Sequence, residues 1–195
     1  MARFSYTAAM SKEYSADKLD VKAFAVAGGH LAGRDTLLRY KRLADLAQGL
    51  HPDLHVDWQA DGQVRAVHGM QGQVWLSLQV HADLPMTCQR CLQAMDVPLQ
   101  VERQFRFVAD EATAEALDSD SEEDLLVLSR EFNLRGLIED ELLMALPVVP
   151  RHDTCPAPVQ MASSDDDFEQ ANVEKTNPFA ALAALQPAPS KPRKP

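Results

Sequence analysis

Three cysteines and one histidine are the residues of this chain best suited to chemistry. Cys88 and Cys91 stand three positions apart in TCQRCL, and His152 and Cys155 have the same spacing in RHDTC. Thiolates and imidazole are the usual ligands of tetrahedral zinc, and a tight turn allows both thiolates of a CxxC pair to face one ion. Cys88, Cys91, His152 and Cys155 are therefore candidate ligands of a structural zinc, the one cofactor that the sequence suggests.

Two other interpretations of the CxxC pair stay open. In one, two thiols lie in a turn between strands, and the histidine and cysteine of RHDTC are unrelated to them. In the other, the pair is a redox site of the thioredoxin kind, which should follow a strand and begin a helix. Pro98 and the next predicted strand follow too closely for that helix, which disfavours the redox interpretation.

The charge balance argues against a strongly basic nucleic-acid binder. The formal net charge is -10, whereas phosphate contacts come mainly from Lys and Arg. Much of the negative charge lies in residues 109–124, a run rich in Asp and Glu that contains no Lys or Arg. We expect this run to be a solvated, self-repelling loop.

Local basic residues are the remaining candidates for contact with RNA or a protein partner. The most basic stretch is 34–42, and further arginines lie near the CxxC pair and on a later strand. Aromatic residues amount to 6%, without a stacking cluster of the RNP kind. The candidate contact residues are Arg34, Arg39, Lys41, Arg42, Arg90, Arg103 and Arg106.

Catalytic motifs are absent from the sequence. We find no GxSxG, P-loop, GxGxxG or HExxH pattern. Glu139, Asp140 and Glu141 are consecutive, so on a helix they point about 100° apart and are poorly placed to share a substrate. We expect a solvated acidic face there, with Arg135 pairing with Glu139, and neither enzymatic activity nor a small-molecule substrate.

Alternating apolar residues predict the strands that must position these groups. The clearest case is 73–81, where Val74, Leu76, Leu78 and Val80 share one side. Tight turns between short strands indicate an antiparallel meander. The predicted strands are 20–26, 54–58, 63–69, 73–81, 99–108 and a buried 125–128, with a loop at 28–33, a hairpin turn at Asp61-Gly62 and a reversal at 69–72.

Two helices are predicted in the same region. One runs over 35–48, capped by Asp35 and ended by Gly49, with Leu43, Leu46, Ala47 and Leu50 on its apolar side. The other begins at Asn133 and stops at Pro147. Its apolar face comprises Leu134, Leu137, Ile138, Leu142, Ala145 and Leu146. The fold class is therefore α+β: an antiparallel β-meander sheet with flanking helices and a partly disordered C-terminal tail.

The predicted organisation is one domain followed by a linker, a short helix and a tail. Residues 1–155 form the α+β domain, 156–176 a linker, 177–186 a short NPFAALAALQ helix and 187–195 a disordered tail. We see no secretory signal in residues 1–20 and no window of 18 apolar residues that would span a membrane. An odd number of cysteines is not a disulfide scaffold, so we expect a cytoplasmic protein without a membrane partner.

Three stretches in this order resemble the YceD family, the large ribosomal RNA subunit accumulation proteins of bacteria: TCQRCL, IEDELLMALPVVPRHDTC (138–155) and NPFAALAAL (177–185). The resemblance implies a cytoplasmic, non-catalytic factor for the synthesis, processing or stability of 23S ribosomal RNA. It implies as partners large-subunit ribosomal RNA or ribosomal proteins of the large subunit. Some relatives carry further cysteines after the helix, whereas this chain has only Cys155 and leaves His152 as the fourth ligand.

Two alternative functions remain at this stage. The chain would be a zinc-stabilised adaptor that docks NPFAALAAL in a partner's groove, or a ribonuclease that uses the carboxylates at 139–141. Metal analysis of the purified protein tests the first, because absence of zinc removes it, and substitution of the carboxylates tests the second.

Overall fold

The structure is a computed structural model that describes residues 14–66 and 72–156. The contacts between residues divide the chain into two units, Met1–Cys155 and Pro156–Pro195. All the helices and strands described here belong to the first unit. That unit holds a five-stranded sheet flanked by helices, which confirms the α+β prediction. Apart from Pro156, the predicted linker, the NPFAALAALQ helix and the tail lie outside the described residues and stay predictions.

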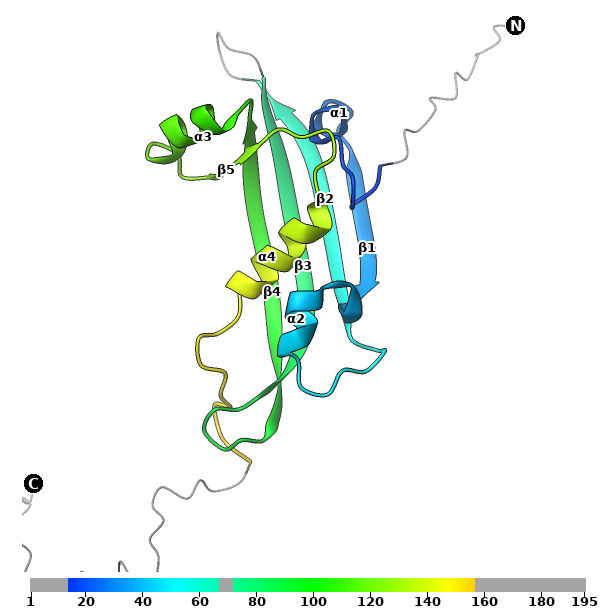
Figure 1. Cartoon of the computed structure of the whole chain (residues 1–195), viewed down its shortest axis with the longest axis vertical. Helices are drawn as coiled ribbons and strands as arrows, with labels where there is room; N and C mark the ends of the chain where they lie inside the picture. The colour runs from blue at the N-terminus through cyan, green and yellow to red at the C-terminus, as the bar shows by residue number, and fades with distance from the viewer. Residues whose placement is uncertain (1–13, 67–71, 157–195) are drawn as a thin grey trace, which may run out of the picture. The chain divides into compact units, whose positions relative to one another are not determined.

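The strands lie across the sheet in chain order (Figure 1). The first four pair antiparallel, as the predicted meander requires, and the fifth pairs parallel to the fourth. Two long central strands form a hairpin that is paired up to its tip at Thr87 and Ala94. The strands are β1 (His30–Thr36), β2 (His55–Arg65), β3 (Gln73–Thr87), β4 (Ala94–Val108) and β5 (Asp124–Val127).

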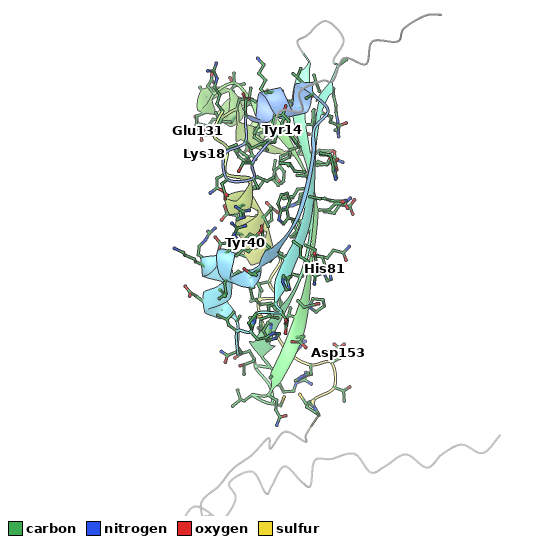
Figure 2. The ribbon with its side chains drawn as sticks, turned by 90° about the vertical axis from the view of Figure 1, so that its right-hand side faces the viewer. Tyr14, Lys18, Tyr40, His81, Glu131 and Asp153 are labelled. Atoms are coloured by element: carbon green, nitrogen blue, oxygen red, sulfur yellow. The ribbon has the colours of Figure 1, made fainter. Side chains whose placement is uncertain are left out.

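The two faces of the sheet differ. Val74, Leu76, Leu78 and Val80 are buried on one face, as their period of two predicted. This covered face packs against α1 (Val21–Val26), α2 (Lys41–Leu46) and α4 (Leu134–Met144), the helices on the left in Figure 2. The opposite face, where His81 points in Figure 2, carries no helix of the described residues, and we call it the open face.

The predicted strand at 20–26 is wrong, because this segment is α1. The Asp20 carboxylate accepts a hydrogen bond from the Ala23 N–H at 3.0 Å and caps the helix. Val21, Phe24 and Ala25 are buried at helical spacing, 0–2% exposed. The apolar residues of VKAFAV fit both the period of a strand and the period of a helix. The cap at Asp20 and the packing of Phe24 against the sheet favour the helix.

The predicted hairpin turn at Asp61-Gly62 is also wrong. β2 continues through both residues, and the reversal falls between Arg65 and Gln73, which are paired. Gly62 serves close packing, because a Cβ there would stand 2.5 Å from a ring carbon of Phe24. Residues 63–65 of the predicted separate strand are therefore the end of β2, and residues 67–69 lie outside the described residues.

The predicted loop at 28–33 and helix at 35–48 are shifted. β1 begins at His30, so only Gly28 and Gly29 remain as a turn. Asp35 lies inside β1, and the helical region is a 3-10 turn, η1 (Leu37–Arg39), followed by the short α2. Asp35 cannot cap this helix because its carboxylate receives hydrogen bonds from elsewhere in the core. Of the predicted apolar side, Leu43 is buried, whereas Leu46 and Leu50 are exposed.

The acidic run at 109–124 is not a loop throughout. It contains α3 (Glu111–Asp118), capped by Asp110, whose side chain accepts from the Thr113 N–H at 2.8 Å. No residue of α3 is buried, so the predicted solvation holds. β5 follows where a buried strand was predicted, but its residues 125–127 are only half-buried, because it pairs with the end of β4 alone.

The long helix begins where the sequence predicts. Asn133 caps α4 by accepting from the Gly136 N–H at 2.9 Å. Leu134, Ile138 and Leu142 are fully buried against the sheet, which confirms the centre of the predicted apolar face. The helix ends before Pro147, and the chain then descends toward the tip of the β3–β4 hairpin (Figure 1).

Candidate functional site

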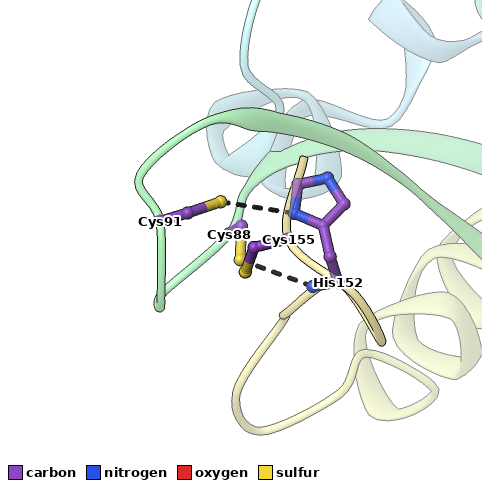
Figure 3. Close-up of side chains that lie close together, drawn as sticks. All are labelled: Cys88, Cys91, His152 and Cys155. Atoms are coloured by element: carbon purple, nitrogen blue, oxygen red, sulfur yellow. Dashed lines mark hydrogen bonds between the residues drawn. The ribbon is translucent and has the colours of Figure 1, made fainter. Parts of the chain in front are cut away.

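The four predicted metal ligands come together at the tip of the β3–β4 hairpin (Figure 3). Cys88 and Cys91 lie in the hairpin turn, and His152 and Cys155 lie in the segment after α4. One ligand atom from each of the four lies within 4.8 Å of the others. We call this set the thiol cluster.

The hairpin turn holds its two thiols by backbone hydrogen bonds. The Cys88 N–H donates to the Gln93 carbonyl and the Leu92 N–H donates to the Cys88 carbonyl, both at 2.9 Å. Leu92 has a φ of 59°, a left-handed conformation that costs energy for a branched residue and closes the turn tightly. The predicted turn between two strands is thus confirmed.

Hydrogen bonds also fix the segment after α4 on this turn. The Gln89 N–H donates to the Pro150 carbonyl at 2.8 Å, and Pro150 is buried. The His152 N–H donates to the Cys88 sulfur, and the Cys91 sulfur lies 3.4 Å from the His152 Nδ1. Pro147 and Pro150 end the helix and turn the chain, which is why RHDTC reaches the hairpin.

The local electrostatics prepare Cys88 as a ligand. Burial by itself would raise the pKa of the Cys88 thiol. Backbone N–H groups of Cys91, His152 and Arg90 donate to its sulfur and together lower the pKa from 9.0 to about 5. Hydrogen bonds that favour the charged form thus prevail over desolvation, and Cys88 offers the thiolate that a metal needs.

Cys155 behaves in the opposite way. Burial and then the neighbouring thiols of Cys91 and Cys88 raise the pKa of Cys155. Negative charges that gather in one place oppose further ionisation, and a bound cation removes this penalty. The thiol cluster is therefore a set of charges that lacks a positive partner among its own side chains.

The donor chemistry fits zinc. Three sulfurs and one imidazole nitrogen form a Cys3His set, and zinc binds such sets tetrahedrally with Zn–S distances of about 2.3 Å and Zn–N of about 2.0 Å. Sulfur atoms around such an ion lie roughly 3.8 Å apart. The cluster, with ligand atoms within 4.8 Å, needs only a small contraction to reach this geometry.

The predicted RNA-contact residues do not form one patch. Arg34 and Arg106 lie on the open face, Arg39, Lys41 and Arg42 around α2, Arg90 at the hairpin tip and Arg103 on the covered side of β4. Five of these residues pair with acids: Arg34 with Asp57, Arg39 with Asp35, Arg42 with Glu139 and Asp140, Arg103 with Glu141 and Asp124, and Arg106 with Glu123. Of these seven residues, Lys41 and Arg90 show no acidic partner within the described part of the chain.

The carboxylates of α4 hold other elements in place. One Glu139 oxygen accepts two hydrogen bonds from the Arg42 guanidinium at 2.9 and 3.0 Å, and the other accepts from the Arg42 backbone N–H at 2.8 Å. Since α2 has no side-chain cap of its own, Glu139 supplies that cap from a different helix. Glu141 is 5% exposed and binds Arg103 at 3.3 Å. The predicted pairing of Arg135 with Glu139 is wrong, because Glu139 reaches Arg42 instead.

Arg135 belongs to a buried network that the sequence did not reveal. It binds Asp17 and donates to Asp35, which lies in β1 and is 8% exposed. The carboxylate of Asp35 accepts four hydrogen bonds: from Arg39 at 2.8 Å and from Tyr40, Trp58 and Arg135 at 3.0 Å each. Asp35 and Arg135 are 100 positions apart, so no local spacing in the sequence predicts their contact.

This network shifts the pKa values of its members. Burial would raise the pKa of Asp35, but its hydrogen bonds, above all that from Arg135, lower the pKa from 3.8 to about 2. Burial and the Asp35 charge raise the pKa of Tyr40. Asp35 therefore stays ionised inside the core and joins β1, β2 and α4.

No helix among the described residues is long and apolar enough to cross a membrane.

Comparison with known proteins gives one family. The family model described as "Large ribosomal RNA subunit accumulation protein YceD" matches residues 76–186. The chain is also similar to the protein of that name from Haemophilus influenzae, with 32% identity over 110 residues. The matched region covers 55% of this chain and 62% of the Haemophilus protein. No solved structure matches the chain.

Proposed function

The chain belongs to the YceD family, described as large ribosomal RNA subunit accumulation proteins, and from this premise we propose that it serves the synthesis, processing or stability of large-subunit ribosomal RNA. The observation that carries the proposal is the family match over residues 76–186 together with the name of the Haemophilus influenzae relative. The match includes α4 and all four residues of the thiol cluster.

The protein acts by binding and catalyses no reaction. The acids at 139–141, which a ribonuclease would use, are engaged by arginines: Glu139 and Asp140 by Arg42, and Glu141 by Arg103. Glu139 in addition caps α2. These contacts give the carboxylates a structural role, which supports a binding protein.

The thiol cluster binds zinc, and the zinc has a structural role. Its Cys3His composition, the low pKa of Cys88 and the docking of the segment 150–155 on the hairpin support this assignment. The metal joins residues 88–91 to residues 152–155 and holds the end of the described chain against the sheet. The contact of residues 150–155 with the hairpin is the observation in favour of a second candidate function, a zinc-stabilised adaptor for protein partners.

The partners are ribosomal RNA or ribosomal proteins of the large subunit. Because most predicted RNA-contact arginines are neutralised by acids, direct contact with RNA relies on the few basic residues that remain, such as Lys41 and Arg90. Contact through a basic protein requires no free arginine on this chain. The negative net charge also favours that route.

A pull-down at moderate salt tests the proposal. Tagged full-length protein is recovered from cells in growth, and the bound RNA and proteins are identified. We expect precursor ribosomal RNA of the large subunit, large-subunit proteins, or both. A variant with Glu139→Gln and Asp140→Asn should restore normal large-subunit RNA to a deletion strain. Recovery of neither RNA nor large-subunit proteins contradicts the proposal, and failure of the double variant, if it folds normally, contradicts the non-catalytic role.

A further inference from the structure

The open face of the sheet is mostly polar, although Trp75 also lies on it beneath Arg65. Its residues alternate with the buried ones of the covered face, so their side chains point away from the helices (Figure 2). No element of the described residues covers it. A sheet that exposes four strands in this way presents a broad surface for a partner.

A shallow groove crosses the middle of the open face. It has a volume of about 390 Å³ and touches β1, β2, β3 and β4. Polar side chains from β2, β3 and β4 line it: Asp57, Gln59, Gln79, His81, Gln100 and Glu102. Three inter-strand spacings of about 4.8 Å make the groove roughly 14 Å long, which accommodates about four residues of an extended peptide.

The open face carries more acids than arginines. Its acids are Asp57, Asp61, Asp83, Asp96 and Glu102, and its arginines are Arg34, Arg65 and Arg106. The arginines are occupied: Arg34 lies 3.6 Å from Asp57, Arg65 covers the ring of Trp75, and Arg106 binds Glu123. Among the described residues, Asp83, Asp96 and Glu102 have no basic partner.

We propose that the open face binds a basic segment, rich in arginine and lysine, of a partner protein. Guanidinium and ammonium groups are donors only, and the groove offers them carboxylates and glutamine carbonyl oxygens as acceptors. Phosphate groups would meet Asp57 and Glu102 and be repelled, which disfavours RNA. A second copy of this chain would bring the same acids face to face and is disfavoured for the same reason.

The inference rests on the proposed function and specifies its partner. A protein that assembles with ribosomal RNA must contact phosphates through Lys and Arg. Such a protein carries exposed basic segments before it reaches its RNA. The open face has the complementary charge to hold one of them, whereas its own Arg34 and Arg106 are already paired with acids.

A peptide titration tests the inference on the full chain. The probe is a fluorescent synthetic peptide of alternating arginine and serine, with an alternating glutamate and serine peptide as control. The open-face variant combines Asp83→Asn, Asp96→Asn and Glu102→Gln. The matched control combines Glu111→Gln, Glu115→Gln and Asp118→Asn on α3, and it removes the same charge from exposed positions elsewhere.

We expect the basic peptide to bind, the acidic peptide not to bind, and the open-face variant to weaken binding about tenfold, with less than about a twofold loss in the α3 variant. Equal weakening by both variants, or no binding by the wild-type protein, overturns the inference. So does a large-subunit RNA fragment that binds the wild type and loses affinity in the open-face variant. If the triple variant does not fold, Glu102→Lys alone should still reduce peptide affinity while the far-ultraviolet spectrum stays unchanged.

The pull-down separates this inference from the proposed function. If large-subunit components are recovered but the basic peptide does not bind, the open-face assignment fails and the proposed function stands. If neither RNA nor large-subunit proteins are recovered, the proposed function fails whatever the peptide result.

Discussion

Two clusters connect α4 and the segment after it to the sheet, and they use different chemistry. At Asp35, one carboxylate accepts four hydrogen bonds and is neutralised by Arg135 of α4. At the hairpin tip, three thiols and an imidazole gather without a positive side chain among them. The first cluster contains its own counter-charge, whereas the second contains no positive side chain that would balance its thiolates. The comparison implies that acid should break the Asp35 network and that a chelator should break the thiol cluster.

Removal of zinc has the largest expected effect. A metal that binds only the folded state stabilises it by about 4 kcal/mol when its free concentration is a thousandfold above its Kd. A chelator should therefore lower Tm by roughly 10 °C for a chain of this size, measured by circular dichroism. The Cys88→Ser variant is the control and should show little response to the chelator. A wild-type Tm that the chelator leaves unchanged contradicts a structural metal.

Asp35→Asn is the corresponding change in the buried network. It leaves Arg135 without its buried partner and places an amide donor among donors, which should lower the free energy of unfolding by about 3 kcal/mol. Urea denaturation measures this loss. Asp17→Asn removes the exposed partner of the same arginine and should cost less than about 1 kcal/mol. Equal losses in the two variants would show that burial of Asp35 adds nothing.

Acid should weaken the Asp35 network in a defined pH window. Because the pKa of Asp35 is about 2 in the folded protein and 3.8 ordinarily, the unfolded state takes up a proton first as the pH falls. The stabilisation is fully present above 3.8 and is lost as the pH falls toward 2, and it amounts to about 2 kcal/mol. Unfolding free energies measured across this window should fall less steeply in Asp35→Asn. Parallel slopes in the two proteins would contradict the lowered pKa.

Glu139→Ala should have the smallest effect of the four. It removes the cap of α2 and a half-buried ion pair with Arg42, which together contribute about 1 kcal/mol. Asp140→Ala removes an ion pair with the same Arg42 but no cap, so its effect on urea denaturation should be smaller. A larger loss for Asp140→Ala would mean that α2 does not depend on the cap from α4.

The two clusters also differ in how far the sequence predicted them. The ligands of the thiol cluster stand in two equal spacings, so the sequence indicated Cys88 and His152 as members of one candidate site. The structure then placed them together, which the interpretation as unrelated residues did not predict. Asp35 and Arg135 have no such spacing. Asp35 was predicted to cap a helix because aspartate is a common N-cap residue. Only the tertiary fold shows that its carboxylate instead accepts hydrogen bonds from side chains of the core.

The same contrast holds for the elements. The strand at 73–81 and the helix from Asn133 have one strong period and one clear cap, and both predictions were confirmed. VKAFAV and Asp61-Gly62 each fit two structures. Phe24 of α1 packs over Gly62, and this one contact favours both the helix at VKAFAV and an uninterrupted β2 through Asp61-Gly62. No local pattern in the sequence predicts the contact.

The most direct test of the account is the metal content of the purified full-length protein, combined with X-ray absorption at the zinc edge. We predict about one zinc per chain, bound by three sulfurs and one nitrogen at distances of about 2.3 and 2.0 Å, and its loss in Cys88→Ser. Reduced wild-type protein that contains no zinc and takes none up, or zinc that Cys88→Ser retains in the same surroundings, would contradict it.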